Sequence, residues 1–360
     1  MTDDERYMAL AIDLARRPPF TSPNPRVGAV VVRFGDILSE GAHEGAGTPH
    51  AEAVALAGID ASGSTLYVNL EPCAFHGRTP PCADAVVSAG VERVVVAIQD
   101  PDPRVDGRGL TVLRDAGIDV EVGILAREAE TLNAPFLHHR RTGRPYVTLK
   151  LALSMDGKMG ASDGTSRWIT GPEARRRVHA RRLEADAVLI GTGTAIVDDP
   201  TLLVTNVPAA RQPRRIVVDS RGTLVAGGKL FDGSAPLTIA TTPAASHDVQ
   251  TAWKEAGAEV SVLSGTSDGV DLPELLDALG KQEVMELYCE GGAALATSLL
   301  RDDVVDRLEI YHAPLLLGGG GPQLGSLGVH SMSEAERWEV TSVERVGEDL
   351  LTTLVRGRAA

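Results

Sequence analysis

Four residues in the first quarter of the chain have the types and spacing of a metal-dependent hydrolytic site. His50 and Glu52 stand two positions apart in "TPHAEAVAL", and Cys73 and Cys82 lie in the segment "PCAFHGRTPPC". A neutral imidazole and two thiolates are good zinc ligands, and they leave the fourth tetrahedral position to a water molecule. Glu52 is not needed as a ligand, so its carboxylate can take a proton from that water and pass it to a leaving nitrogen.

The two cysteines also permit blander interpretations. A disulfide is disfavoured because the chain has three cysteines, an odd number, and because "MTDDERYMALAIDLARR" lacks the apolar stretch of a secretory signal, which predicts a cytoplasmic protein. A structural metal clip would need a fourth protein ligand. H-x-E occurs often by chance and a buried cysteine usually only packs, so it is the conjunction of both pairs, with each cysteine preceded by proline, that favours catalysis.

The elements expected around these residues alternate as in an α/β domain. Helices are expected over 4–17, 50–59, 80–90 and 110–117, and strands over 27–33, 64–72, 91–100 and 118–124. His50 and Cys82 thus fall at helix starts, and Cys73 follows a strand. A helix N-terminus favours the thiolate that Cys82 must become.

A second α/β unit is expected after a polar, turn-prone stretch near residues 140–146. It begins near 143–159, its helix covers 171–185, and its strands are expected over 186–196, 214–220, 236–242, 284–292 and 306–319. A chain of 360 residues is also long for one core, so two domains are predicted, 1–144 and 145–360.

Composition limits the partners. A hydrophobic content of 43% is typical of globular proteins, and no apolar run is long enough to cross a membrane. The net charge of −14 and the aromatic content of 4% argue against nucleic acid as a partner. A small anionic ligand remains possible if a local basic pocket exists.

The second unit offers weaker signals. "GTGTAI" has G-x-G without a third glycine in register, so it is a poor dinucleotide fingerprint. A buried strand that runs into Gly291 and Gly292 and then a helix is a better diphosphate site. Arg175, His179 and Arg182 share one helix face, either as a trap for a phosphate or as an ordinary solvated face.

Together these motifs resemble the bifunctional riboflavin-biosynthesis deaminase/reductase family. The resemblance rests on "TSPNPRVGAVVV", "GAHEGAGTPHAE" and the eight-residue loop between the cysteines, where other zinc nucleoside deaminases have two residues. It continues through "KLALSMDGKM", "SRWITGPEAR", "GTGTAIVDDP", "RRIVVDS" and "EGGAALA", nearly the whole chain.

The resemblance implies a cytidine-deaminase-like three-layer domain followed by a dihydrofolate-reductase-like domain, with Zn²⁺ and NADPH as cofactors. The expected reactions are deamination of 2,5-diamino-6-(5-phosphoribosylamino)pyrimidin-4-one, a small phosphorylated pyrimidine, and then reduction of its ribosyl chain to ribityl. A homo-oligomer is expected. A deaminase for another base, and a chain in which the reductase domain has decayed, are the alternatives.

The resemblance also implies residue roles. Zinc would be held by His50, Cys73 and Cys82, and Glu52 would move the proton. The expected NADPH contacts are Ala152, Trp168, Thr194, Asp198, Ser220, Gly291, Gly292, Ala293, Ala294, Leu295 and Ala296. The expected substrate contacts are Asn24, His43, Ser166, Arg182, Leu202 and Glu290.

Other positions are less determined. Family members usually carry Arg where this chain has Thr205, so one substrate contact is in doubt, and Arg211 or Arg214 could compensate. Lys150 and Asp199 are both candidates for proton movement in the reductase. His76 and Arg78 could meet the ribose phosphate, and Cys289 is expected to be a core residue.

Overall fold

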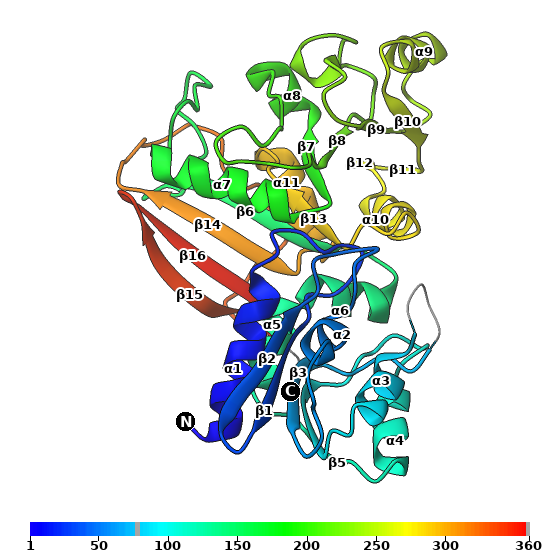
Figure 1. The fold of residues 1–360 in the computed structure, drawn as a ribbon. Helices are drawn as coiled ribbons and strands as arrows, with labels where there is room; N and C mark the ends of the chain where they lie inside the picture. Colours follow the sequence, from blue (N-terminus) through cyan, green and yellow to red (C-terminus); the bar gives the residue numbers. More distant parts are fainter. Residues whose placement is uncertain (76–79, 358–360) are drawn as a thin grey trace. The chain divides into compact units, whose positions relative to one another are not determined.

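Two large sheets organise the chain in the computed structural model, which describes residues 1–75 and 80–357. The chain divides into two compact units, Met1–Gly143 and Arg144–Ala360, and each unit contains one of the sheets (Figure 1).

The first unit is built on a five-stranded sheet in the order β2-β1-β3-β4-β5. Its strands are β1 (Gly28–Arg33), β2 (Asp36–Ala42), β3 (Thr65–Leu70), β4 (Arg93–Ile98) and β5 (Asp119–Val122). β1 pairs antiparallel with β2 and β3, whereas β3, β4 and β5 are parallel. β3 and β4 are buried along almost their whole length, as expected of strands covered on both faces.

Helices cover both faces of this sheet. They are α1 (Asp3–Arg16), α2 (Ala51–Leu56), α3 (Cys82–Ser88), α4 (Arg108–Asp115), α5 (Ala126–Leu132) and α6 (Ala134–Thr142). α1 contacts α5 in one layer, and α3 contacts both α2 and α4 in the other. The three-layer architecture expected from the sequence is therefore confirmed. α6 occupies part of the stretch that the sequence indicated as a turn-prone boundary.

Two glycines let these helices lie close to the sheet. A Cβ on Gly28 would lie 2.1 Å from the carbonyl oxygen of Ala11 in α1, and a Cβ on Gly41 would lie 2.2 Å from that of Ala51 in α2. Any larger residue at Gly41 would push α2 away from β2, and α2 is the helix that follows His50.

The second unit is built on a nine-stranded sheet in the order β10-β9-β8-β7-β13-β6-β14-β16-β15. Its strands are β6 (Tyr146–Ser154), β7 (Ala187–Gly191), β8 (Arg214–Val218), β9 (Leu237–Thr241), β10 (Glu259–Val262), β13 (Glu286–Cys289), β14 (Arg307–Ala313), β15 (Trp338–Val346) and β16 (Asp349–Arg356). In this order, every neighbouring pair between β10 at one edge and β14 is parallel. β16 and β15 follow β14 and add an antiparallel edge.

Helices also cover both faces of the second sheet. They are α7 (Pro172–Glu184), α8 (Thr192–Asp198), α9 (His247–Glu255), α10 (Leu272–Gly280) and α11 (Ala293–Arg301), with a 3₁₀ helix η1 (Lys229–Phe231) and a small hairpin, β11 (Gly265–Thr266) and β12 (Gly269–Val270). Leu287 of β13 packs in the core with α10 and α11, whereas Tyr288 packs in the core with α7, because neighbouring strand residues face opposite sides.

One expected element is shorter than the sequence indicated. A strand was predicted over 186–196, but β7 ends at Gly191 and helix α8 follows at once. The Thr192 hydroxyl donates to the carbonyl oxygen of Val218 at 2.7 Å, which fixes the chain where it leaves the sheet.

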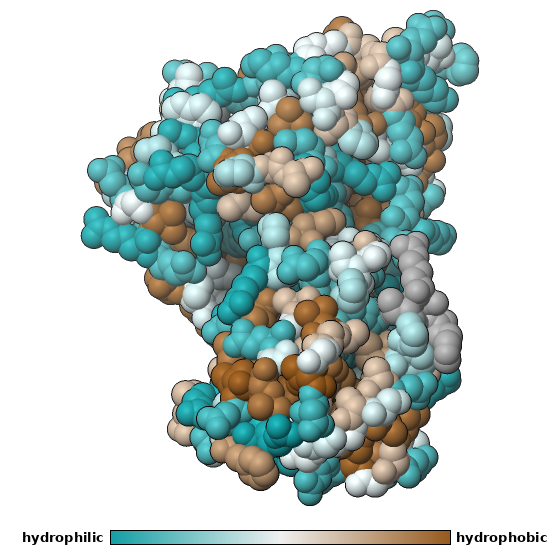
Figure 2. Space-filling model, viewed as in Figure 1, coloured by the Kyte–Doolittle hydropathy of each residue, from teal (hydrophilic) through white to brown (hydrophobic). Residues whose placement is uncertain are grey.

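The surface of the second unit is mainly polar, as the charged and polar content of the sequence indicates. On the face shown in Figure 2, hydrophilic residues dominate the second unit and apolar ones are scattered among them. Among the described residues, no helix is both long and apolar enough to cross a membrane.

Candidate active sites

The first site brings together the three expected metal ligands. His50 caps the start of α2, Cys82 is the first residue of α3, and Cys73 lies three residues beyond the end of β3. Their ligand atoms lie within 4.8 Å of one another. His50 Nδ1 lies 3.1 Å from Cys82 Sγ and 3.6 Å from Cys73 Sγ. All three cysteines are free, so Cys73 and Cys82 form no disulfide.

The ligand cluster is held by its own backbone. The amide of Cys82, in the first turn of α3, donates to Cys73 Sγ at 3.4 Å. Contacts from Cys82 and His50 hold the pKa of the Cys73 thiol well below its usual range, which favours its thiolate form. Among the residues that the structure describes, no fourth ligand atom joins the group.

Glu52 lies beside this cluster and is not part of it. Its side chain is 3% exposed, on the first turn of α2. Burial raises the pKa of Glu52 to about 7, because the carboxylate loses water. A carboxyl group with such a pKa can both accept and release a proton near neutral pH.

The structure also places Asn24 and His43 together. Asn24 Nδ2 lies 2.9 Å from His43 Nε2, and His43 Nδ1 lies 3.0 Å from the carbonyl oxygen of Pro49. A carbonyl only accepts, so Nδ1 carries the hydrogen and Nε2 accepts from the Asn24 amide. Burial lowers the pKa of His43, which keeps the ring neutral. The rings of His43 and His50 pack edge to face, 5.3 Å apart.

Glu71 is a supporting residue that the sequence reasoning missed. It is buried at the end of β3, two residues before Cys73. Its carboxylate accepts four backbone N–H bonds, from Asp100, Gly107, Gly109 and Leu110, at 2.9 to 3.2 Å. Glu71 thereby ties the segment that leads into Cys73 to the loop after β4 and to the first turn of α4.

The same loop also reaches the segment that follows Cys73. The Arg104 guanidinium lies 4.7 Å from the centre of the Phe75 ring, and Asp102 accepts from Arg104 at 2.7 Å. A signal for Glu71 was available, because an acid in the buried run "YVNLEP" needs partners. His76 and Arg78 lie outside the described residues.

The second site is a cavity of about 1030 Å³ in the second unit. Most of the residues expected to contact NADPH line it, namely Ala152, Trp168, Thr194, Asp198, Ser220, Gly291, Gly292, Ala293, Ala294 and Leu295. The expected substrate contacts of this unit line it as well, namely Ser166, Arg182, Leu202 and Glu290. Ala296 does not, because it faces the core with no exposed surface and its N–H donates to Gly292 O.

The start of α11 offers the cavity a set of backbone donors. Gly292 caps this nine-residue helix, and no side chain caps its first turn. A Cβ on Gly291 would lie 2.9 Å from Leu295 Cδ2, and a Cβ on Gly292 would lie 3.1 Å from Thr194 Oγ1. The absence of these two side chains leaves the N–H groups and the positive end of the helix dipole open to an anion.

The basic residues on one face of α7, which the sequence suggested as a phosphate trap, mostly bind other protein groups. Arg182 forms a double ion pair with Glu290, one arm at 2.9 Å, and both side chains are 11% exposed. His179 Nδ1 accepts from the backbone N–H of Thr205 at 3.3 Å, and burial and Arg182 lower the pKa of His179. Arg175 is half-buried and donates to the carbonyl oxygen of Thr170 at 2.7 Å, with its guanidinium 4.5 Å from the Trp168 ring centre.

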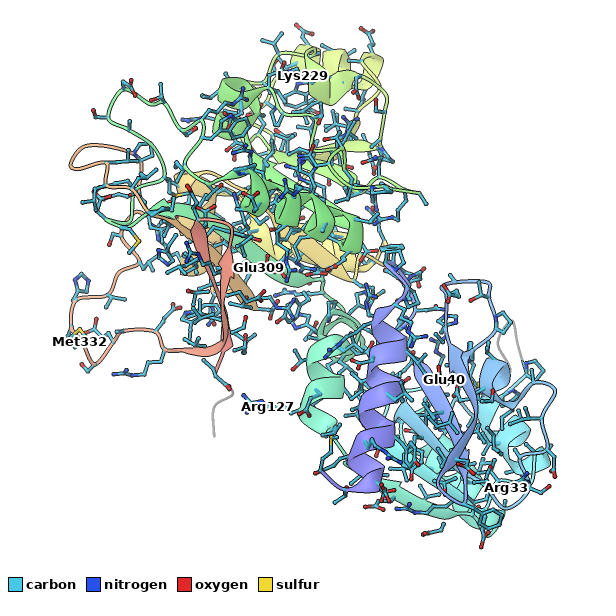
Figure 3. All side chains as sticks on the ribbon, turned by 60° about the vertical axis from the view of Figure 1, so that its left-hand side comes forward. Arg33, Glu40, Arg127, Lys229, Glu309 and Met332 are labelled. Carbon is cyan, nitrogen blue, oxygen red and sulfur yellow. The ribbon has the colours of Figure 1, made fainter. Side chains whose placement is uncertain are left out.

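Buried charges on the sheet hold α7 in place. Arg181 donates to Glu286 at 2.6 Å and, at 2.9 Å, to Glu309 of β14, which is labelled in Figure 3. This network fixes the turn of helix that carries Arg182, so the Arg182–Glu290 pair has one orientation.

The two candidate proton donors differ in their surroundings. Lys150 lines the cavity from β6, and burial lowers its pKa. Asp199 accepts from the backbone N–H of Lys229 at 2.8 Å, and Lys229 Nζ lies 3.8 Å from its carboxylate. The Asp199 carboxylate is therefore already engaged by the backbone and side chain of Lys229.

Thr205 lines the cavity with an exposed side chain. Neither residue considered as a replacement for the expected arginine lines it. Arg211 donates to the carbonyl oxygens of Leu183 and Ala185, and Arg214 donates to Gln282. Cys289 is fully buried in the core, as expected.

Comparisons with known proteins agree with both sites. The family model described as "Cytidine and deoxycytidylate deaminase zinc-binding region" matches residues 1–98, and the "RibD C-terminal domain" model matches residues 145–352. The riboflavin biosynthesis protein RibD of Aquifex aeolicus is 44% identical, over 97% of each chain. The chain belongs to the RibD family.

Solved RibD structures share its architecture along the whole chain. Acinetobacter baumannii RibD has a TM-score of 0.88 and 37% identity, over 99% of both chains. The Thermotoga maritima deaminase/reductase has a TM-score of 0.86 and 32% identity, also over 99% of both chains. The protein is therefore a bifunctional riboflavin-biosynthesis enzyme, with a zinc-dependent deaminase domain and an NADPH-dependent reductase domain.

Proposed function

We propose that the chain catalyses two consecutive steps, with residues 1–144 as the deaminase and 145–360 as the reductase. The first step hydrolyses one exocyclic amine of 2,5-diamino-6-(5-phosphoribosylamino)pyrimidin-4-one, and the second reduces the ribosyl chain to ribityl. The description of the Thermotoga maritima relative names this pair of activities. The observation that carries the proposal is the cluster of His50, Cys73 and Cys82 with a buried acid beside it.

The residues of the first site fit zinc. One imidazole nitrogen and two sulfurs form a donor set that Zn²⁺ favours. In a tetrahedral site, bonds of about 2.0 Å to nitrogen and about 2.3 Å to sulfur separate the two ligand atoms by roughly 3.5 Å. The spacings of 3.1 and 3.6 Å from His50 Nδ1 to the two sulfurs are close to this value. Zinc bound here supplies Lewis acidity, which makes a water molecule nucleophilic at neutral pH.

The protein residues then have separate tasks in deamination. Glu52 takes the proton from the attacking water and delivers it to the departing amine nitrogen. The C–N bond breaks as the new C–O bond is completed, and ammonia leaves. Asn24 orients the pyrimidine ring, because one Nδ2 hydrogen is donated to His43, which turns its Oδ1 to accept a hydrogen from the ring edge. His43 holds that amide in one orientation.

The cavity of the second unit fits a dinucleotide. Ligand sites usually have volumes of about 300 to 1,000 Å³, and this cavity is at the upper end, with room for a cofactor and a substrate together. The uncapped first turn of α11 would hold the diphosphate, and the two glycines before it leave the space that a diphosphate needs. Bound NADPH supplies the hydride.

The surrounding residues prepare the substrate for reduction. The bond between C1′ and the ring oxygen of the ribosyl group must break, and that oxygen must receive a proton as hydride reaches C1′. Lys150 is placed to give this proton, because it lines the cavity and burial weakens its hold on the proton. The Arg182–Glu290 pair presents a fixed carboxylate to the pyrimidine, and Ser166 and Leu202 line the same cavity.

A coupled assay tests this function. Zinc-loaded protein is given the diaminopyrimidinone ribosyl phosphate, and ammonia release and the loss of NADPH absorbance are followed separately. We expect both signals, with NADPH loss only after deamination. Ammonia without NADPH loss would refute the reductase assignment. If neither signal appeared, the substrate assignment would be wrong.

We also infer a homo-oligomer and a reducing, cytoplasmic location. β15 is an edge strand, and its Val340 and Val343 are 54% and 64% exposed, which supports pairing with a second copy. The three free thiols support a reducing compartment. Sedimentation equilibrium measures the first inference, and a monomer at micromolar concentration would contradict it.

A further inference from the structure

Three of the six lysine and arginine side chains that line the reductase cavity are paired with carboxylates of the protein. Arg167 lies 3.2 Å from Asp198, Arg182 is paired with Glu290, and Lys229, labelled in Figure 3, lies 3.8 Å from Asp199. A phosphate that binds in this cavity gains little attraction from cations that are already paired with carboxylates.

Arg221 is different. It lines the same cavity and is exposed, and its guanidinium has no hydrogen-bond or ion-pair partner among the residues that the structure describes. It follows Ser220, an expected cofactor contact. The Ser220 Oγ accepts from the backbone N–H of Val270 at 3.0 Å, which leaves the hydroxyl hydrogen available to a ligand.

The loop that carries Arg221 is rigidly held. The carboxylate of Asp219, which is 1% exposed, accepts from the backbone N–H groups of Arg221, Gly222 and Leu224, at 3.4, 3.1 and 2.7 Å. The backbone of this loop is therefore fixed before any ligand arrives, and only the Arg221 side chain has to be ordered on binding.

The order of strands places Arg221 on the adenosine side of the cofactor. The cavity residues Lys150, Gly291, Thr194 and Ser220 follow or lie on β6, β13, β7 and β8, which are successive strands of the sheet. If the diphosphate lies at α11, beyond β13, the nicotinamide and substrate occupy the β6 side with Lys150. The adenosine then extends toward β8, two strands or about 10 Å from β13.

We propose that Arg221 binds the 2′-phosphate of NADPH and thereby selects NADPH over NADH. This inference rests on the cofactor placement given under the proposed function. Two carboxylates, Asp268 and Asp302, line the cavity too, and they would repel a phosphate. Asp268 pairs with Arg301, so that arginine is not available to the cofactor. An unpaired guanidinium can bind a phosphate with two parallel hydrogen bonds, which NADH cannot use.

The test compares the two cofactors in the same variant. In Arg221→Gln we expect KM for NADPH to rise about 10- to 100-fold, while KM for NADH and kcat with either cofactor change by less than about twofold. Arg221→Lys keeps the charge but lacks the planar guanidinium, so its KM for NADPH should lie between the values of the unaltered protein and of Arg221→Gln. Calorimetry with adenosine 2′,5′-bisphosphate and with AMP should show a loss of affinity for the bisphosphate alone.

Lys229→Gln is the matched control, because it removes a cavity cation that is already paired with Asp199. It should leave the ratio of the two KM values unchanged. Equal losses for NADPH and NADH in Arg221→Gln, or no loss at all, would overturn the inference while leaving the reductase assignment intact. Failure of the unaltered protein to oxidise NADPH would instead refute the proposed function, and deaminase activity in every variant reports correct folding of the first unit.

Discussion

The two sites use their acidic residues in opposite ways. Glu52 is buried, and no arginine or lysine among the residues that the structure describes pairs with it, so its pKa rises to about 7 and the carboxyl can carry a proton. Glu290 is also buried, but the paired Arg182 holds its pKa below the ordinary value and keeps it charged. Burial alone therefore does not determine the role of a carboxyl group, because the neighbouring charge decides whether it titrates or stays fixed.

The sites also differ in extent. The deaminase ligands come from a stretch of the chain between His50 and Cys82, and their ligand atoms lie within 4.8 Å of one another. The reductase cavity is lined by residues from Lys150 to Pro322. A single substitution should consequently abolish the first activity, whereas most substitutions should weaken the second by degrees.

The largest effect is expected for Glu52→Gln. The amide keeps the shape of the side chain and removes the proton carrier, so kcat for ammonia release should fall about 1,000- to 10,000-fold. Zinc content should be unchanged, because Glu52 is not among the ligands. Reduction of substrate that has already been deaminated should also be unchanged.

Glu40→Gln, on the exposed part of β2 (Figure 3), is the matched control and should retain full activity. Normal deamination by Glu52→Gln would mean that Glu52 is not the proton carrier. Loss of zinc in the same variant would mean that Glu52 is itself a ligand.

A smaller effect is expected for Lys150→Met in the reductase. Removal of the proton donor should lower kcat for NADPH oxidation about 100- to 1,000-fold, with deamination unaffected. Lys254→Met, on the exposed surface of α9, is the control. If Lys150→Met lowered only the affinity for substrate, the residue would be a binding group instead of the acid.

The pH profile of the unaltered reductase also tests whether Lys150 is the proton donor. Burial lowers the pKa of Lys150, while Glu290, Glu309 and Asp198 raise it and Arg182 lowers it further. The ammonium is the form that donates, so kcat for reduction should be constant at low pH and should fall as pH rises through this pKa. That midpoint should lie below the usual lysine value of about 10.4. A rate that rises with pH would contradict the assignment.

Glu71→Gln probes how the compact site is supported, with a moderate expected effect. The amide replaces one acceptor oxygen by an NH₂ group that faces backbone donors, so the segment before Cys73 should shift. Zinc affinity should fall about 10- to 100-fold, as measured by competition with a chromophoric chelator. Thermal unfolding of the zinc-free protein is measured in parallel. A lower melting temperature with unchanged zinc affinity would assign Glu71 to stability alone.

The compact site could be predicted from the sequence more fully than the extended one. His50, Glu52, Cys73 and Cys82 lie at helix starts and after a strand, positions that local patterns indicate well. The four N–H bonds to Glu71 were not predictable, because they depend on the path of a loop that begins about thirty residues later. Asn24 and His43 were named from the family, but their hydrogen bond required the fold.

In the second unit the sequence indicated the glycines before α11 and the strands that flank them. It could not show that Arg182 is paired with Glu290, since the two are far apart in the chain. Ala296 was assigned to the cofactor because it continues the motif, but helix periodicity turns it toward the core. Arg221 was overlooked although its neighbour Ser220 was assigned to the cofactor, because only the fold shows which arginines of the cavity are paired with carboxylates.

The smallest effect is expected for Thr205→Arg, which adds a contact to the extended site. The backbone N–H of Thr205 donates to His179 and its side chain is exposed, so the substitution should not disturb the fold. A guanidinium here should lower KM for the deaminated substrate about 3- to 10-fold, with kcat unchanged. The dephosphorylated substrate should show no gain if the new contact is to the phosphate. An equal gain with both substrates would place the contact at a hydroxyl. A change in kcat would mean that this single position controls the chemistry. The reductase site would then be as localised as the deaminase site.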